Sequence, residues 1–284
     1  MILRLPERLF LYIIILLFCP LHFWTASAHA TTYPGYSGTT ANDGTKLNGL
    51  VGAPFTAGCA AQTYNGNLYC SRTDFALSSK GIPLEIRFSF NSQLRLLDTP
   101  YGKGWQFSYG LNYFVHSNGD ISILRGDGRL DTFTESGGTY TPPAGITDTL
   151  EEYLPGQFRL STKRGIRFYF DNATHKTLTS MTESNGNTLT FTYNPSDLLT
   201  AITDASWRTV TLTYGGNNKV STITDPAGKV WTYAYDVSGN LTSVTDPLAN
   251  ITSYSYGTNS RLTGITDPEG NTTTFAYSTF SGFG

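Results

Sequence analysis

The sequence predicts an all-β protein in which antiparallel β-hairpin repeats stack into one sheet behind a β-meander domain. A 21-residue unit occurs five times without a gap across residues 178–282, and a fixed period of this length indicates a repeat architecture. Apolar and polar residues alternate in the segments upstream, and Asn-Gly and Asp-Gly pairs separate those segments. No window after residue 30 has the period of a long amphipathic helix.

Residues 1–30 have the three regions of a secretory signal peptide. Two arginines precede an apolar run at 9–18, and the segment closes with Ala28-His29-Ala30. This run is too short to cross a bilayer, which takes roughly 20 residues. We expect cleavage after Ala30, with cleavage after Ala28 or lipidation of Cys19 as alternatives. The protein is therefore predicted to be secreted or displayed at the cell surface, with no membrane span after cleavage.

Composition argues against several classes of function. The formal net charge is −2, and it becomes −3 when residues 1–30 are removed with their two arginines and one glutamate. Without a basic cluster we expect no nucleic-acid partner. Only His116 and His175 remain after residue 30, so no Ser-His-Asp or Cys-His set can be assembled. No glycine-rich phosphate loop precedes a helix. The sequence thus predicts a non-enzymatic protein with no cofactor and no metal.

The residues ahead of the repeats divide into a leader and a domain. Residues 31–58 are rich in Gly, Thr, Ser and Asn and predict an irregular leader. Residues 59–156 predict a β-rich domain. Leu84 to Phe90 alternates apolar and polar residues, which is typical of a half-buried strand. Asn118-Gly119 and Asp127-Gly128 separate later alternating segments and predict hairpin turns, hence a meander of antiparallel strands.

Two cysteines remain after signal cleavage, Cys59 and Cys70. An isolated pair in an exported protein is most simply a disulfide, here closing the loop around residues 64–68. A catalytic or metal-binding role would need a histidine or carboxylate cluster close in sequence. Both remaining histidines are distant, so two free thiols are the other alternative.

Residues 157–177 resemble a degenerate copy of the repeat. Leu160 and Gly165 fall on apolar and glycine positions of the unit, and Phe168 and Phe170 fall on its alternating positions. This copy raises the expected number of units to six, and five of them, at 178–282, are regular.

Each regular unit alternates large and small side chains. With its first residue as position 1, positions 12, 14 and 16 are mostly aromatic or aliphatic, whereas positions 11, 13 and 15 are mostly Thr, Ser or Ala. Alternate side chains of a strand point to opposite faces, so each unit presents one apolar face. Aromatic residues of neighbouring units are expected to stack on one another. We interpret the invariant tyrosines of position 16 as packing residues, with a sugar-stacking row as the alternative: Tyr193, Tyr214, Tyr235, Tyr256 and Tyr277.

A second invariant feature is an aspartate at position 6 of four units: Asp204, Asp225, Asp246 and Asp267. Most stand in Asp-Pro-x-Gly or a variant, where proline presets φ and glycine permits the turn. An aspartate at the start of a turn accepts hydrogen bonds from backbone amides two residues on. No second carboxylate accompanies each at a fixed spacing, as calcium binding or glycoside hydrolysis would require. We therefore predict a turn-forming role.

The segment from Gly228 to Pro247 resembles the YD repeat of the Rhs family. It contains a glycine, two alternating tyrosines, the Tyr235-Asp236 dipeptide, Gly239 and then Thr-Asp-Pro. Upstream, residues 66–74, 90–92, 102–105 and 142–145 resemble the domain that precedes the repeats in many Rhs proteins.

This resemblance implies a curved, open, shell-like sheet, the N-terminal shell segment of a protein that encapsulates or presents a C-terminal effector of the polymorphic toxin type. The autoproteolytic core motif and the effector domain of that family are not found in the sequence. We therefore expect an incomplete shell whose partners are further Rhs repeats, a downstream effector, or a second copy at its C-terminal edge.

Two other hypotheses come from different classes. A cell-surface adhesin or carbohydrate-binding module would bind a surface glycan through exposed aromatic residues. A polysaccharide-cleaving enzyme would need paired carboxylates, which the sequence does not offer. The tripeptide Arg125-Gly126-Asp127 spells an adhesion motif, yet it stands in a predicted turn where these residue types are common.

Overall fold

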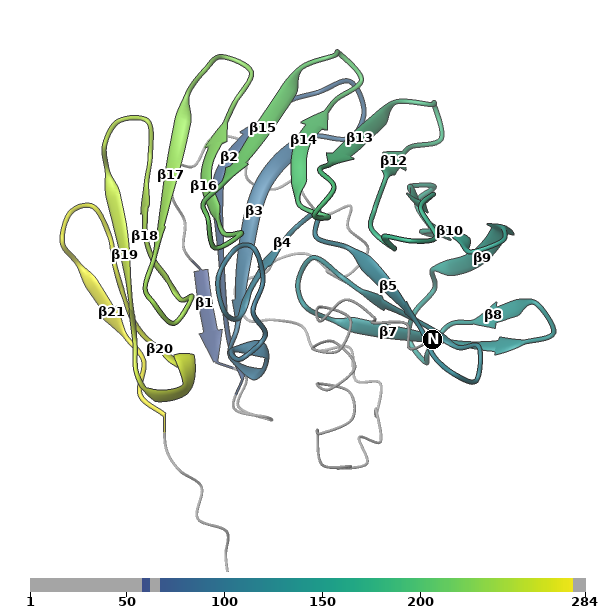
Figure 1. The fold of residues 1–284 in the computed structure, drawn as a ribbon, viewed down its shortest axis with the longest axis horizontal. Coiled ribbons are helices and arrows are strands. Elements are labelled where there is room, and N and C mark those ends of the chain that lie inside the picture. The colour runs from purple at the N-terminus through teal and green to yellow at the C-terminus, as the bar shows by residue number, and fades with distance from the viewer. Residues whose placement is uncertain (1–57, 62–66, 278–284) are drawn as a thin grey trace, which may run out of the picture. The chain divides into compact units, whose positions relative to one another are not determined.

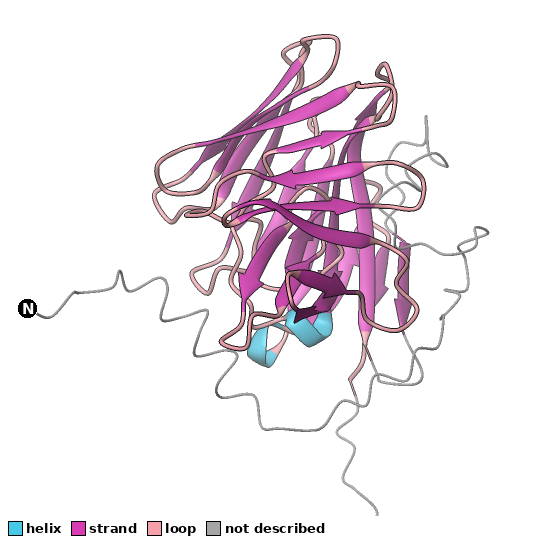
Figure 2. Ribbon diagram, turned by 90° about the vertical axis from the view of Figure 1, so that its right-hand side faces the viewer, coloured by secondary structure: helices cyan, strands magenta, loops and turns pink. Residues whose placement is uncertain are grey.

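The computed structural model describes residues 58–61 and 67–277. The regular secondary structure of these residues is almost entirely β-strand, with 3% helix, so the all-β prediction is confirmed (Figures 1 and 2). The predicted signal peptide, nearly all of the leader and the last residues of the fifth unit lie outside the described residues.

The first strands form a separate four-stranded sheet in the order β1-β2-β3-β4, which we call the N-terminal sheet. Its strands are β1 (Gly58–Ala61), β2 (Leu68–Leu77), β3 (Leu84–Asn91) and β4 (Trp105–Phe107), and a short 3-10 helix, η1 (Ser92–Leu94), follows β3. All three pairings are antiparallel. The sheet is made wholly from residues upstream of the repeats.

The alternation from Leu84 to Phe90 predicted a half-buried strand, and this prediction is wrong because β3 is buried on both faces. Its polar residues Glu85 and Ser89 are 4% and 3% exposed. The Thr73 hydroxyl donates to the Glu85 carboxylate at 2.8 Å, and the Ser89 hydroxyl donates to the Gly126 carbonyl at 3.4 Å. Polar partners from β2 and from the turn after β6 thus allow the polar face to be covered.

Seventeen further strands form one antiparallel sheet in which each strand pairs with the next in sequence. They are β5 (Asn112–Val115), β6 (Ile121–Leu124), β7 (Leu130–Ser136), β8 (Thr139–Thr141), β9 (Thr149–Leu154), β10 (Gln157–Ser161), β11 (Arg167–Phe170), β12 (Ser180–Thr182), β13 (Thr188–Tyr193), β14 (Leu199–Thr203), β15 (Thr209–Tyr214), β16 (Val220–Thr224), β17 (Val230–Tyr235), β18 (Leu241–Thr245), β19 (Ile251–Tyr256), β20 (Leu262–Thr266) and β21 (Thr272–Thr274), with a 3-10 helix η2 (Thr258–Ser260) before β20. In the described part of the chain no strand pairing joins β21 to β5, and the sheet is open.

The sheet begins in the domain that precedes the repeats. Strands β5 to β9 come from that domain, and β9 pairs with β10 of the degenerate unit. An isolated bridge joins Asn112 of β5 to Thr177, just before β12. The backbone N–H of Tyr113 donates a hydrogen bond to the Lys176 carbonyl at 3.0 Å. The first strands of the sheet therefore curl until β5 meets the chain that leads into the regular repeats.

Each regular unit is a hairpin of a short and a long strand, as the turn chemistry predicted. In the third unit, Ile223 of β16 pairs with Trp231 of β17. The long strand then pairs with the short strand of the next unit, Tyr233 with Val244. A register shift precedes each position-16 tyrosine from Tyr193 to Tyr256, and such bulges change the direction of a side chain.

The two faces of the repeats differ as the alternation predicts. Positions 4 and 14 are buried in the first four units, and position 13 is exposed in all five. The expected stacking of aromatic residues between neighbouring units is wrong for the rings that the structure describes. A short strand with Ile or Val at position 4 lies between successive long strands, as Ile223 lies between Leu212 and Trp231. Equivalent positions are thus two strands, roughly 10 Å, apart, beyond the distance for ring contact.

The turn between the short and long strands needs a left-handed backbone at position 9. Gly228 occupies it with φ +82°, whereas Ala249 has φ +63° in the same position of the next unit. In the left-handed region a residue with a Cβ is less stable than glycine by about 1–2 kcal/mol. Glycine keeps only part of this advantage, because it gains more conformational entropy on unfolding.

We therefore expect Ala249→Gly to raise the free energy of unfolding by about 0.5–1 kcal/mol. Gly228→Ala is the matched reverse change, and because no atom lies within 4 Å of the added Cβ, it should lower stability by a similar amount. Urea unfolding of both variants measures this. A loss of stability in Ala249→Gly would contradict the assignment of strain.

Candidate functional site

The N-terminal sheet packs on the apolar face of the repeats, and this interface is the candidate functional site. Phe75 of β2 stacks on Trp231 of the third unit with ring centroids 4.2 Å apart. Trp105 of β4 meets Tyr254 of the fourth unit edge-on at 5.1 Å. Aromatic residues of the repeats thus find ring partners in the N-terminal sheet, about 150 residues away in sequence.

A buried ion pair lies in the middle of this interface. Arg72 Nη2 donates to Asp74 Oδ2 at 3.1 Å, and the two side chains are 2% and 0% exposed. The guanidinium carbon of Arg72 lies 5.3 Å from the ring centre of Tyr233 and 5.9 Å from that of Tyr254, distances at which a cation is attracted to an aromatic face. The Tyr233 hydroxyl donates to Asp74 Oδ2.

Burial dominates the ionisation of these groups. It raises the pKa of the Tyr233 hydroxyl well above its ordinary value, and the neighbouring Asp74 raises that pKa further. Burial also raises the pKa of Asp74, against the opposing effect of Arg72. Burial is the largest influence on Arg72 and disfavours its charged form, but Asp74, Tyr254 and Tyr233 together outweigh it, and the pKa of Arg72 is raised. The tyrosine therefore acts as a hydrogen-bond donor, not as a base.

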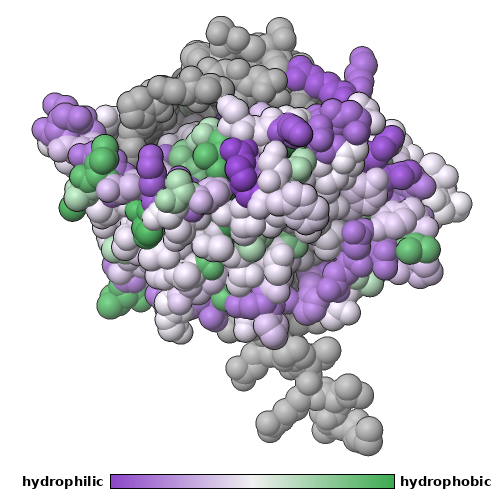
Figure 3. Space-filling view, turned by 90° about the horizontal axis from the view of Figure 1, so that it is seen from above, coloured by the Kyte–Doolittle hydropathy of each residue, from purple (hydrophilic) through white to green (hydrophobic). Residues whose placement is uncertain are grey.

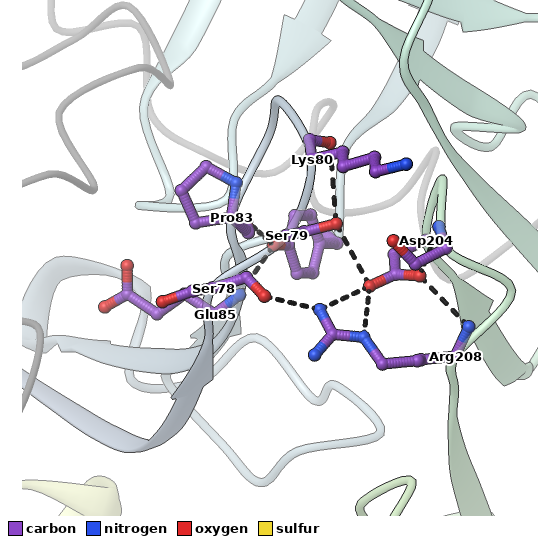
Figure 4. Close-up of polar contacts among 9 residues, drawn as sticks. Ser78, Ser79, Lys80, Pro83, Glu85, Asp204 and Arg208 are labelled. Carbon is purple, nitrogen blue, oxygen red and sulfur yellow. Dashed lines mark hydrogen bonds and ion pairs between the residues drawn. The ribbon is translucent and has the colours of Figure 1, made fainter.

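The loop after β2 is attached to the turn of the second unit (Figure 4). The Ser79 hydroxyl donates to Asp204 Oδ2 at 3.0 Å. Arg208 donates from Nε to the same carboxylate at 2.9 Å and from Nη2 to the Ser78 carbonyl at 2.6 Å. Asp204 thus holds its own turn and the N-terminal sheet together.

The loop before β4 is attached to the second and third units. Lys219 Nζ donates to the Thr99 carbonyl at 2.6 Å and forms an ion pair with Asp98. The backbone N–H of Val220 donates to the Pro100 carbonyl at 2.9 Å. With the Asp204 contact, this attachment fixes the N-terminal sheet at the loops that precede β3 and β4.

Most of the repeated tyrosines form a hydrogen bond within their own unit. Tyr193, Tyr214 and Tyr277 donate from their hydroxyls to the carbonyl of position 1 of the same unit, at 2.8, 2.6 and 2.9 Å. Tyr256 instead accepts a hydrogen bond from Trp105 Nε1 at 2.8 Å. These tyrosines, and Tyr235 with them, are half-buried. They do not present the row of exposed rings that a sugar-stacking surface would need.

The predicted turn aspartates accept backbone hydrogen bonds at the start of each turn. Asp225 Oδ1 accepts from the N–H groups of Ala227 and Lys229 at 2.8 and 2.9 Å, and Asp246 has the same pattern. The Asn271 side-chain amide, with backbone N–H groups, holds the pKa of Asp267 below its ordinary value. These hydrogen bonds are those that a turn-forming aspartate makes.

Other residues singled out in the sequence have structural positions. Cys59 and Cys70 face each other across β1 and β2, with Cα atoms 4.0 Å apart, and form a disulfide. Arg125 of the adhesion-like tripeptide is 6% exposed and donates to Asp131 and Asp148 at 2.8 and 2.6 Å. A partner that recognises this tripeptide would therefore meet an arginine that is buried.

The described residues contain no group of three or more His, Cys, Asp or Glu side chains placed to hold a metal ion. In the same part of the chain, no helix has the length and apolar character to cross a membrane. The coloured surface seen from above is largely of intermediate hydropathy, with hydrophilic patches and separate hydrophobic spots (Figure 3).

These features define an all-β repeat protein whose N-terminal sheet is packed on its own repeats. Residues 172–209, 214–251 and 235–272 match the model of the RHS Repeat, and residues 58–133 match that of a domain of unknown function (DUF6531). The chain belongs to the Rhs/YD-repeat family. The resemblance read from the sequence is thereby confirmed.

Solved structures with some likeness are components of Tc toxins. A Photorhabdus luminescens Tc holotoxin pore has 14% sequence identity and a TM-score of 0.32, with 75% of this chain and 15% of that chain covered. The crystal structure of TcdB2-TccC3-TEV has 14% identity and a TM-score of 0.24, with 72% and 15% covered. This chain therefore spans a small part of their length. A search of curated proteins finds no matching sequence.

Proposed function

We propose that the chain is a non-enzymatic, secreted scaffold, the N-terminal shell segment of an Rhs/YD-repeat protein that encapsulates or presents a C-terminal effector of the polymorphic toxin type. The observation that carries this proposal is the contrast between the covered and uncovered ends of the repeat sheet. In the first four units, position 14 is buried; in the fifth unit Phe275 is half-buried and Thr273, at position 12, is exposed.

The edge of the sheet supports the same proposal. All three residues of β21 are exposed. The N–H of Phe275 donates inward to the Thr263 carbonyl at 2.8 Å, and alternation along an antiparallel strand directs the N–H of Thr274 outward. An exposed edge of this kind is a template for another strand. Further Rhs repeats, a segment of a downstream effector or a second copy of the chain would fit it.

Export is the second part of the proposal. The signal-peptide pattern of residues 1–30 and the Cys59–Cys70 disulfide both fit a secreted or cell-surface protein. The absence of a catalytic role is supported by the structural use of the turn aspartates, whose oxygens accept backbone hydrogen bonds.

Sedimentation velocity of the mature chain, residues 31–284, tests the role of the edge. We expect association that grows with protein concentration, and Thr274→Pro should abolish it because proline removes the outward N–H while leaving the bonds between β20 and β21. Thr274→Ser keeps the N–H and is the matched control. A chain that stays monomeric at high concentration, with Phe275 protected from solvent, would contradict the proposal and favour a self-contained binding module.

A glycan-binding adhesin is the second candidate, and one observation favours it. Trp207 is 86% exposed at a turn tip, with φ +61° where three other units have glycine. Exposed aromatic rings can stack on sugars. Titration of the chain with surface polysaccharide, read by tryptophan fluorescence, should give no binding to Trp207→Ala if this candidate is right.

A further inference from the structure

Position 14 of the repeat is buried in four units, yet its chemistry varies. Two units carry a hydroxyl there and three do not. In order, the residues are Phe191, Leu212, Tyr233, Tyr254 and Phe275. Position 4 is apolar and position 16 is tyrosine in all five units, whereas position 14 changes between polar and apolar residues.

The two hydroxyl-bearing units are those that meet the buried ion pair. Tyr233 donates to Asp74 and lies 5.3 Å from the guanidinium carbon of Arg72. Tyr254 lies on the same guanidinium, at 5.9 Å. By contrast Phe191, in the first unit, packs on the ring of Tyr109 at 5.3 Å. Polar position-14 residues thus face charge, and an apolar one faces an aromatic ring.

Exchanging neighbouring units would leave the ion pair without these partners. Leu212 in the place of Tyr233 would remove the hydroxyl from which Asp74 accepts a hydrogen bond and the ring that lies on Arg72. A buried charge that loses a partner is strongly destabilising. In contrast, replacing both members of a buried ion pair by apolar residues often leaves the stability of a protein unchanged. We therefore expect the pair to affect the discrimination between units more than the overall stability.

Other contacts of the N-terminal sheet also depend on residues that occur in one unit alone. Trp231 is the single tryptophan at position 12 and stacks on Phe75. Lys219 is the single lysine at position 21 and holds the loop of Asp98 and Thr99. Each of these contacts would be lost if the unit stood elsewhere.

We propose that the Arg72–Asp74 pair selects the third unit as the docking surface of the N-terminal sheet, by recognising the position-14 hydroxyl of Tyr233, while the ring of Tyr254 from the fourth unit lies on the same guanidinium. The 21-residue units are then not interchangeable, although their sequences align without a gap. This inference deepens the proposed scaffold function, because it identifies the residues that set the order of units beneath the N-terminal sheet.

The test is a double-mutant cycle on the full chain, read by the unfolding equilibrium in urea. Tyr233→Phe removes one oxygen and should reduce the folding equilibrium constant by about tenfold or more, since it leaves a buried carboxylate short of a donor. In the Arg72→Met/Asp74→Leu background the same change should have an effect within about twofold. Phe275→Tyr, at the half-buried position 14 of the fifth unit, is a control expected to stay within about twofold of the wild type.

Equal losses from Tyr233→Phe in the two backgrounds, or no loss in either, would overturn the proposal. If the double variant does not fold, Asp74→Asn replaces it, because a neutral acceptor should reduce the loss caused by Tyr233→Phe. The double-mutant cycle measures only the stability of the fold. If sedimentation velocity showed a monomeric chain, that result would contradict the proposed role of the β21 edge, but the double-mutant cycle would still test the role of the ion pair.

Discussion

Trp231→Ala is expected to lower the free energy of unfolding by about 3–5 kcal/mol, the usual cost of truncating a large buried aromatic side chain. Trp231 is buried at position 12 and stacks on Phe75 with centroids 4.2 Å apart. The change would leave a cavity at the centre of the interface between the N-terminal sheet and the repeats. Both sides are held by other contacts, so the cavity cannot collapse fully.

Thr232→Ala is the matched control, one residue further along β17. Its side chain is exposed on the opposite face, so the expected loss is below about 0.5 kcal/mol. Urea unfolding followed by far-UV circular dichroism compares the two variants without relying on tryptophan fluorescence. Similar losses in both would mean that the two faces of the repeat have been assigned the wrong way round.

The sequence predicted which face of each repeat is buried, because the 21-residue period aligns equivalent positions of the five units. Five copies in one register give five independent observations of each position, and alternation along a strand converts them into two faces. The turns were predictable for the same reason. Asp225, Pro226 and Gly228 each have a local role that depends on no distant residue. A prediction that rests on local turn chemistry is reliable when the same residues recur in several units.

The partner of the apolar face was not predictable. Nothing near Arg72 or Asp74 in sequence indicates burial, and charged residues are rarely buried without partners. Their partner Tyr233 lies 159 residues beyond Asp74. The burial of the polar face of β3 was missed for a related reason, since part of its cover comes from Gly126, in the turn between β6 and β7 of the other sheet. One signal was present in the sequence, namely the interruption of the repeat at position 14 by Tyr233 and Tyr254 among apolar residues.

The tyrosines of position 16 illustrate a partial success. Their repetition indicated packing, and they are half-buried against the core. Their main polar contact, a hydrogen bond from Tyr214 to the Leu199 carbonyl at 2.6 Å, depends on the register shift that precedes the tyrosine. A bulge is a departure from alternation, so a pattern that assumes alternation cannot predict it.

The buried arginine of the adhesion-like tripeptide gives the second large expected effect. Arg125 donates to Asp131 at 2.8 Å and to Asp148 at 2.6 Å, and all three side chains are buried. Arg125→Met keeps much of the side-chain length but leaves two buried carboxylates, with Arg129 bound to one of them at 2.7 Å. Breaking a buried pair from one side costs about 3–5 kcal/mol, and we expect a loss in that range.

Arg159→Met is the matched control for Arg125→Met, because Arg159 pairs with Glu151 at 2.5 Å on a more exposed surface of β10. An exposed pair contributes at most about 1 kcal/mol, and its removal should change the urea midpoint little. Raising the salt concentration should reduce the effect of Arg159→Met more than that of Arg125→Met, since screening acts mainly on exposed charges. If Arg125→Met proved as mild as Arg159→Met, the tripeptide would be free of its structural role, and an adhesive role for residues 125–127 would have to be reconsidered.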